Sequence, residues 1–330
     1  MLDMTVMLLL VIIFALVFDF INGFHDTANA IATPVSTRAI SPKVAILGSA
    51  FLNFCGALLG TGVAKTIGGD IVKSASMVNA NVLVAALIAA ILWNLVTWWY
   101  GIPSSSSHAL IGGLVGAVAA ASGFGALSLA GIEKIFLSLI ASPLIALVSG
   151  YLIMLALLWI FGRFAPSVLN RSFNKMQILS AAVMAFSHGS NDAQKAMGII
   201  TLALLSGGFI ETFEVPTWVM FVCASSMALG TAAGGKKIIK TMGTNIFRMS
   251  PINGFAADLG AAMVISLATF FHLPVSTTHV ISGSIMGVGS AKRVTAVRWT
   301  VAQNMLMARA LTIPLSAGVG VLNYKVTLYL

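Results

Sequence analysis

Two aspartates lie within long apolar stretches, and each follows a glycine by three residues. Asp26 and Asp192 hold matching places in the runs Asn22-Gly23-Phe24-His25-Asp26-Thr27-Ala28-Asn29-Ala30 and His188-Gly189-Ser190-Asn191-Asp192-Ala193-Gln194-Lys195-Ala196. A carboxylate in an apolar membrane segment is costly unless it faces a partner or water. Side-chain amides flank both carboxylates, and such a set of oxygen atoms suits a hard cation such as Na⁺, or a proton. We therefore predict a cation site at Asn22, Asp26, Asn191 and Asp192; aspartates that only cap helices are the alternative.

A second pair of motifs is rich in hydroxyl groups. The runs are Ile102-Pro103-Ser104-Ser105-Ser106-Ser107-His108 and Leu273-Pro274-Val275-Ser276-Thr277-Thr278-His279. Proline suits the start of a helix, and serine and threonine are preferred N-caps. We therefore predict a helix N-terminus at each run, inside the membrane, whose unpaired N–H groups and partial positive charge bind an anion. The predicted anion-binding residues are Ser104, Ser105, Ser106, Ser107, Ser276, Thr277 and Thr278, together with Asp26, Asn29, Asp192, Gln194 and Lys195. Contacts between helices, the alternative use of such hydroxyls, explain one or two of them but not seven.

Basic and acidic residues near these motifs have several possible roles. Lys195 is the one lysine inside a motif, and it could neutralise a bound anion, pair with Asp192 or extend to the surface. Asp19 lies one helical turn before Asn22 and could support it, whereas Asp258 could be a helix cap or a functional group. We expect the motif histidines mainly to orient their neighbours by hydrogen bonds, with a proton relay as the alternative; zinc binding has no support from cysteines or from His-x-x-His spacing. These supporting histidines are His25, His108, His188 and His279.

The two pairs of motifs indicate that the chain is a duplication. Asp26 pairs with Asp192, and Pro103 pairs with Pro274, so the aspartate motif precedes the proline motif in both cases and the separation between them is nearly the same. We place the halves at about 1–162 and 174–330, within one transmembrane domain. If each half crosses the membrane an odd number of times, the halves have inverted topology, as in transporters with broken helices and a site near the midplane.

The elements that must position these motifs are apolar helices. We expect them at 2–22, 44–66, 80–100, 104–123 and 133–161 in the first half. In the second half we expect them at 176–206 (broken near the motif), 216–234, 252–272, 276–290 and 297–323. The apolar run from Met4 to Phe18 is not followed by an Ala-x-Ala-type cleavage site, so we expect a retained first helix.

Composition excludes a soluble protein. Hydrophobic residues make up 58% of the 330 residues and charged residues only 8%, whereas soluble domains carry about 25% charged residues. Between Lys73 and Glu133 there is no charged residue at all. We therefore predict an all-α, multi-pass protein of the cell membrane, in contact with the lipid bilayer.

The net charge of +9 does not indicate binding to nucleic acid. The basic residues gather in connections between apolar runs, and connections of this kind tend to face the cytoplasm. The three clusters are Arg163, Arg171 and Lys175; Lys236, Lys237, Lys240 and Arg248; and Lys292, Arg293 and Arg298.

At these motifs the sequence resembles the inorganic phosphate transporter (Pit) family, over nearly the whole chain. The resemblance implies secondary transport of phosphate driven by Na⁺ or H⁺, without a cofactor, and an inverted-repeat helical fold with paired re-entrant hairpins that is often a dimer. It implies roles for Asp26, Asn29, Asp192, Ser104 to Ser107 and Ser276 to Thr278. One departure concerns coupling: Asp192-Ala193-Gln194-Lys195 replaces the Asn-Ala pair of many sodium-coupled members and is similar to the bacterial proton-coupled form.

The working hypothesis is a phosphate symporter that operates by alternating access. Phosphate and a cation would bind between the halves, where each offsets the charge of the other. Three alternatives stay open: a sulfate permease on the same scaffold, an anion channel, and a membrane-embedded enzyme that acts on phosphate groups. Against the enzyme, no nucleophile with an adjacent activating base is recognisable in the sequence.

Overall fold

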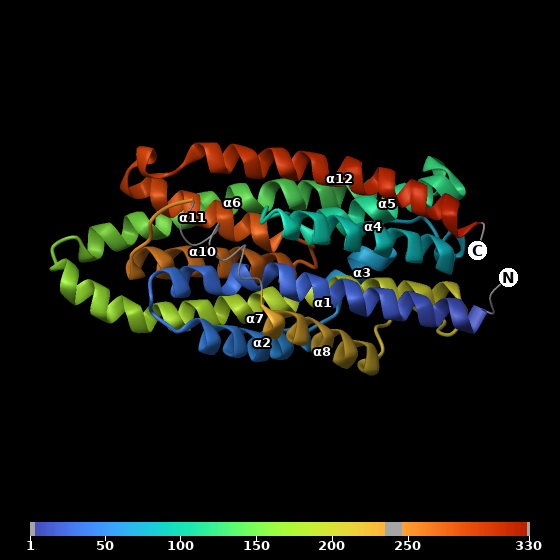
Figure 1. The fold of residues 1–330 in the computed structure, drawn as a ribbon, viewed down its shortest axis with the longest axis horizontal. Helices are drawn as coiled ribbons and strands as arrows, with labels where there is room; N and C mark the ends of the chain where they lie inside the picture. Colours follow the sequence, from blue (N-terminus) through green and yellow to red (C-terminus); the bar gives the residue numbers. More distant parts are fainter. Residues whose placement is uncertain (1–3, 235–245, 329–330) are drawn as a thin grey trace.

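The computed structural model describes residues 4–234 and 246–328, and within them the fold is entirely helical (Figure 1). The first half contains α1 (Met4–Ser36), α2 (Pro42–Ala57), α3 (Gly62–Gly69), η1 (Ala75–Met77), α4 (Ala80–Trp99), α5 (Ser106–Ser122), η2 (Phe124–Ala126) and α6 (Leu129–Phe161). The second half contains α7 (Pro166–Ser206), α8 (Thr217–Ala233), α10 (Pro251–Phe270), α11 (Thr277–Lys292), η4 (Val294–Ala296) and α12 (Trp299–Thr327). Of the predicted basic clusters, Lys236, Lys237 and Lys240 lie outside the described residues.

The helices are those of a protein that crosses a membrane several times. Five helices among the described residues are long and apolar enough to span a bilayer, and α2 with α3, bent by 73° at their junction, could form a sixth span. Their outer faces carry large apolar side chains, such as Trp159, Leu129 and Phe270, which are 88%, 78% and 75% exposed. Such a surface requires lipid to cover it, so the predicted all-α polytopic fold is confirmed.

The helices of the two halves exchange packing partners. Helix α1 packs against α8, and its counterpart α7 packs against α2. In the same way α5 packs against α12, and α11 packs against α6. Each half therefore completes its core with helices of the other half, as expected for a duplicated chain that folds as one unit.

The prediction of a helix break near the second motif is wrong. Helix α7 runs unbroken from Pro166 to Ser206, and α1 continues through the first motif to Ser36 instead of ending near residue 22. The motif glycines serve close helix crossings: a Cβ on Gly23 would lie 2.2 Å from the Met227 carbonyl oxygen, and one on Gly189 would lie 2.2 Å from that of Asn53. The glycines therefore bring α1 onto α8, and α7 onto α2, without interrupting either helix.

Replacing Gly23 by alanine should lower the thermal stability of the protein. The added methyl group would press on the Met227 carbonyl of α8, and such overpacking costs about 1–3 kcal/mol. The matched control is Gly48→Ala in α2, because a Cβ there meets no atom within 4 Å. Thermal unfolding of the purified variants in detergent measures the difference. Equal unfolding temperatures for the two variants would contradict the role assigned to Gly23.

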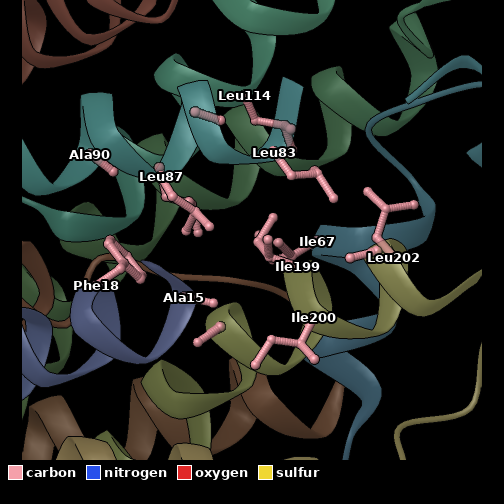
Figure 2. Close-up of a cluster of buried hydrophobic side chains, with 14 of the residues drawn as sticks. Ala15, Phe18, Ile67, Leu83, Leu87, Ala90, Leu114, Ile199, Ile200 and Leu202 are labelled. Carbon is pink, nitrogen blue, oxygen red and sulfur yellow. The ribbon is translucent and has the colours of Figure 1, made fainter. Parts of the chain in front are cut away.

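Two apolar cores enclose the middle of the bundle. The first contains Ala15 and Phe18 of α1, which precede the first motif, and Ile199 of α7, which follows the second, packed with Leu83 and Leu87 of α4 (Figure 2). The second core lies among α6, α7, α10 and α11 on the other side of the motifs. The polar motifs therefore lie between two apolar layers, away from both ends of the molecule.

Candidate functional site

Two helices begin inside the molecule, at the hydroxyl-rich motifs. Helix α4 turns back into α5 just before Ser105, and α10 turns back into α11 just before Ser276. The Ser105 hydroxyl accepts a hydrogen bond from the backbone N–H of His108 at 3.2 Å, and the Ser276 hydroxyl accepts one from that of His279 at 3.4 Å. The predicted helix starts with serine N-caps are thus present in the structure at both motifs.

The two helix starts meet each other. The Ser107 hydroxyl donates to the Val275 carbonyl oxygen at 2.9 Å, across the boundary between the halves. The rings of His108 and His279 pack edge to face, with centroids 5.1 Å apart. Two helix N-termini, each with the partial positive charge of its dipole, therefore converge from different halves on one region.

The two aspartates also meet, although they come from α1 and α7. Asp26, His188 and Asp192 are all buried and can each offer a ligand atom within 4.8 Å of the others. Three ligand atoms this close together could hold one metal ion between them. The motifs of both halves thus form a single buried cluster rather than two separate sites.

Hydroxyl groups connect the aspartates to the helix starts. Ser106 donates to Asn22 at 2.6 Å and lies 3.4 Å from Asp26, within its own half. Thr277 donates to Asp192 at 3.2 Å in the same manner. Thr278 crosses between the halves, because its hydroxyl lies 3.2 Å from an oxygen of Asp26. The groups predicted to bind an anion are therefore in direct contact with those predicted to bind a cation.

Asn29 strengthens the link between the halves. Its amide nitrogen donates to the hydroxyls of Thr278 at 3.0 Å and Thr277 at 3.3 Å. Its carbonyl oxygen is buried and has no hydrogen-bond partner among the described residues. This acceptor lies beside Asp26, because Asp26 and Asn29 both contact the Thr278 hydroxyl.

The motif side chains next to the aspartates are fixed by polar residues of neighbouring helices. His25 bonds Asp26 at 2.8 Å through one ring nitrogen and Thr97 of α4 at 3.3 Å through the other. Asn191, which holds the matching position in the second half, donates to Thr269 of α10 at 2.9 Å. These contacts attach each motif to the helical hairpin of its own half, which is formed by α4 and α5 in the first half and by α10 and α11 in the second. They support the orienting role expected for His25.

His188 bonds a residue that the sequence analysis missed. One ring nitrogen lies 3.3 Å from the side-chain oxygen of Asn53 in α2, and the other lies 3.6 Å from Asp192. Asn53 and Thr97 are both buried. Each stands as an isolated polar residue within an apolar run, and this is the signal that could have identified them.

Lys195 is completely buried and forms an ion pair with Asp192. The ammonium nitrogen lies 2.7 Å from the carboxylate, and neither side chain has any exposed area. The predicted pairing is therefore found, whereas extension of Lys195 to the surface is wrong. A buried charge is costly unless it is paired, and the contact gives this lysine an oppositely charged partner inside the cluster.

Two predicted ligands point to other partners. The Ser104 hydroxyl lies 3.2 Å from the Trp93 indole nitrogen and 3.1 Å from Thr312 of α12. The Gln194 carbonyl oxygen accepts from the backbone of Val63 at 2.8 Å, and so caps the N-terminus of α3. Both side chains thus hold helices in place around the cluster.

A cavity of about 740 Å³ lies beside the cluster. It is bounded by α3, by the segment that follows α7 and by the turn between α10 and α11, and its lining includes Lys65, Gln194 and His272. The cavity borders the second motif, because Gln194 belongs to that motif and Thr269 accepts a hydrogen bond from Asn191. Its wall carries charges of both signs, on Lys65 and Glu214.

Comparison with known proteins identifies relatives of the whole chain. The model of the phosphate transporter family matches residues 22–320. The chain is 53% identical to a probable low-affinity inorganic phosphate transporter of Bacillus subtilis (strain 168), covering 97% of this chain and 96% of that protein. A protein of the same description from Rhizobium meliloti (strain 1021) is 46% identical, covering 94% and 93%. A solved structure described as the sodium-dependent phosphate transporter has the same fold, with a TM-score of 0.89 at 24% identity, covering 98% of this chain and 100% of that one.

Proposed function

Because the chain belongs to the phosphate transporter family, we propose that it carries inorganic phosphate across the cell membrane in symport with Na⁺ or H⁺, by alternating access. The family consists of transporters rather than enzymes, and the chain is a multi-pass membrane protein. Phosphate and the cation bind between two halves of inverted topology, residues 1–162 and 174–330.

One observation carries the proposal: two helix N-termini and two aspartates converge in one buried cluster. The helix starts at Ser105 and Ser276 offer N–H groups and positive dipole ends to the phosphate oxygens. Asp26 and Asp192 provide the negative charge that the cation offsets. Without the cation, phosphate and carboxylates would repel each other, so binding of each favours binding of the other.

The two acidic groups favour phosphate over sulfate. Phosphate near neutral pH still carries a proton, which a carboxylate or an amide oxygen can accept as a hydrogen bond. Sulfate carries no proton, so it would leave the same oxygens facing an anion without a donor. The carboxylates of Asp26 and Asp192 are acceptors of the kind that phosphate requires.

The placement of the chain ends supports the inverted arrangement. The first residues of α1 and the last residues of α12 lie at the same end of the bundle (Figure 1). The connection between α6 and α7, which contains Arg163, lies at the opposite end, and Arg171 and Lys175 follow it near the start of α7. Since basic connections face the cytoplasm, α1 begins and α12 ends on the outer side.

Uptake of radiolabelled phosphate into proteoliposomes tests the proposal. We expect accumulation under an imposed gradient of one cation, Na⁺ or H⁺, and none when neither gradient is present. Excess sulfate should leave the rate unchanged, whereas equal inhibition by sulfate and by unlabelled phosphate would favour a sulfate permease. Phosphate flux without coupling to any gradient, at rates far above those of a carrier, would favour a channel and overturn the symport proposal.

A further inference from the structure

In the internal repeat, Lys195 corresponds to a residue of the first half that carries an amide. When the halves are aligned so that Asp26 matches Asp192, Asn29 corresponds to Lys195. Both positions lie three residues after the aspartate on a continuous helix, and both side chains are buried. One half therefore offers a neutral oxygen at this position, and the other half offers a cation.

In the first half the amide completes a set of cation ligands. The Asn29 and Asp26 side chains both contact the Thr278 hydroxyl, at 3.0 Å and 3.2 Å, so they lie side by side. The carbonyl oxygen of Asn29 has no partner among the described residues. A carboxylate oxygen next to an unpaired amide oxygen is a donor set for a hard cation.

In the second half the cation is part of the chain. The Lys195 ammonium lies 2.7 Å from Asp192 in an ion pair, with no exposed area and with no hydrogen-bond partner in the described part of the chain. Its counterpart, the Asn29 amide, contacts the opposite hairpin instead. Lys195 thus provides at Asp192 the positive charge that a bound ion would otherwise provide.

A second ionisable residue without a counterpart accompanies this lysine. Asp19 has no exposed area, and neither of its carboxylate oxygens has a hydrogen-bond partner among the described residues. In the same alignment of the halves its counterpart is Ala185, so at these two positions each half has one ionisable residue that the other half lacks.

We propose that the ammonium of Lys195 takes, at Asp192, the place of a second coupling cation, so that each transport cycle carries a cation bound at Asp26 and none bound at Asp192. The inference rests on the proposed function and specifies its coupling. A mobile ion at Asp192 would have to enter and leave in every cycle. The tethered ammonium instead stays with the carrier and offsets the charge of Asp192 in both directions of transport.

The test is equilibrium binding of radiolabelled phosphate to purified wild-type protein and to Lys195→Asn, which copies the residue of the first half. We expect Lys195→Asn to bind phosphate about ten-fold more weakly in choline chloride, because Asp192 then repels the anion. Methylammonium or Na⁺, at the same ionic strength, should restore the affinity by filling the vacated place. Methylammonium should leave wild-type binding unchanged.

The matched control is Lys134→Asn, which removes a lysine from a partly exposed ion pair with Asp70. It should bind phosphate like wild-type protein in every salt. Wild-type affinity of Lys195→Asn in choline, or weakened binding that no small cation restores, would overturn the inference. If Lys195→Asn does not fold, the double variant Asp19→Asn/Lys195→Asn removes one charge of each sign and is assayed in the same way. Failure of wild-type and Lys134→Asn protein to bind phosphate in either choline chloride or sodium chloride would instead count against the proposed function.

Discussion

Asp26→Asn should abolish gradient-driven phosphate uptake in proteoliposomes, to about a hundredth of the wild-type rate or less. Asparagine keeps the shape of the side chain but removes the negative charge that would hold the coupling cation. The Asp26 oxygens also accept a hydrogen bond from Thr278 and lie within reach of Ser106. The change therefore alters groups that would contact the cation and groups that would contact phosphate. The loss should therefore affect accumulation more than folding.

Exchange of internal for external phosphate under the same conditions separates the two candidate ions. An asparagine resembles a protonated aspartate, so with H⁺ as the coupling ion Asp26→Asn should still exchange phosphate while failing to accumulate it. With Na⁺ as the coupling ion, both exchange and accumulation should be lost. The control is Asp70→Asn, because Asp70 is partly exposed and pairs with Lys134. Accumulation by Asp26→Asn within about two-fold of wild type would contradict the role of Asp26.

The sequence predicted which residues come together better than it predicted the course of the helices. The paired motifs indicated that Asp26 and Asp192 lie together. The prolines before the hydroxyl runs indicated helix N-termini. Both predictions depend only on residue types within the motifs. The continuity of α1 and α7 was not predictable in this way. A glycine such as Gly23 can break a helix or admit a close neighbour, and the neighbour here is Met227, which belongs to the other half of the chain.

The predictions for individual binding residues were limited in the same way, by contacts with distant parts of the chain. Ser104 and Gln194 lie within motifs, so they were predicted to bind substrate, yet Trp93 and the α3 N-terminus engage them. Ser105 is likewise occupied as the N-cap of α5. A motif identifies which residue types gather at a site, whereas the direction of each side chain depends on tertiary partners that the motif does not contain.

Those partners single out Thr278 as the hydroxyl whose loss should weaken phosphate binding most. It is the hydroxyl that contacts Asp26 at 3.2 Å while accepting from Asn29 at 3.0 Å, and so it joins the motif of one half to the hairpin of the other. Valine has nearly the same shape but can neither donate nor accept. Thr278→Val would leave a buried carboxylate and a buried amide each short of a partner, which costs about 1–3 kcal/mol.

We therefore expect Thr278→Val to lower phosphate affinity by about ten- to a hundred-fold in equilibrium binding. Thr201→Val is the matched control, because Thr201 is equally buried in α7 but bonds only the Met197 carbonyl of its own helix. Ser105→Ala provides the opposite case: loss of the N-cap should lower thermal stability by about 1 kcal/mol and affinity less than Thr278→Val does. If Thr278→Val binds phosphate as tightly as Thr201→Val does, the Thr278 hydroxyl serves only to pack the two halves together. The phosphate site must then lie elsewhere in the cluster.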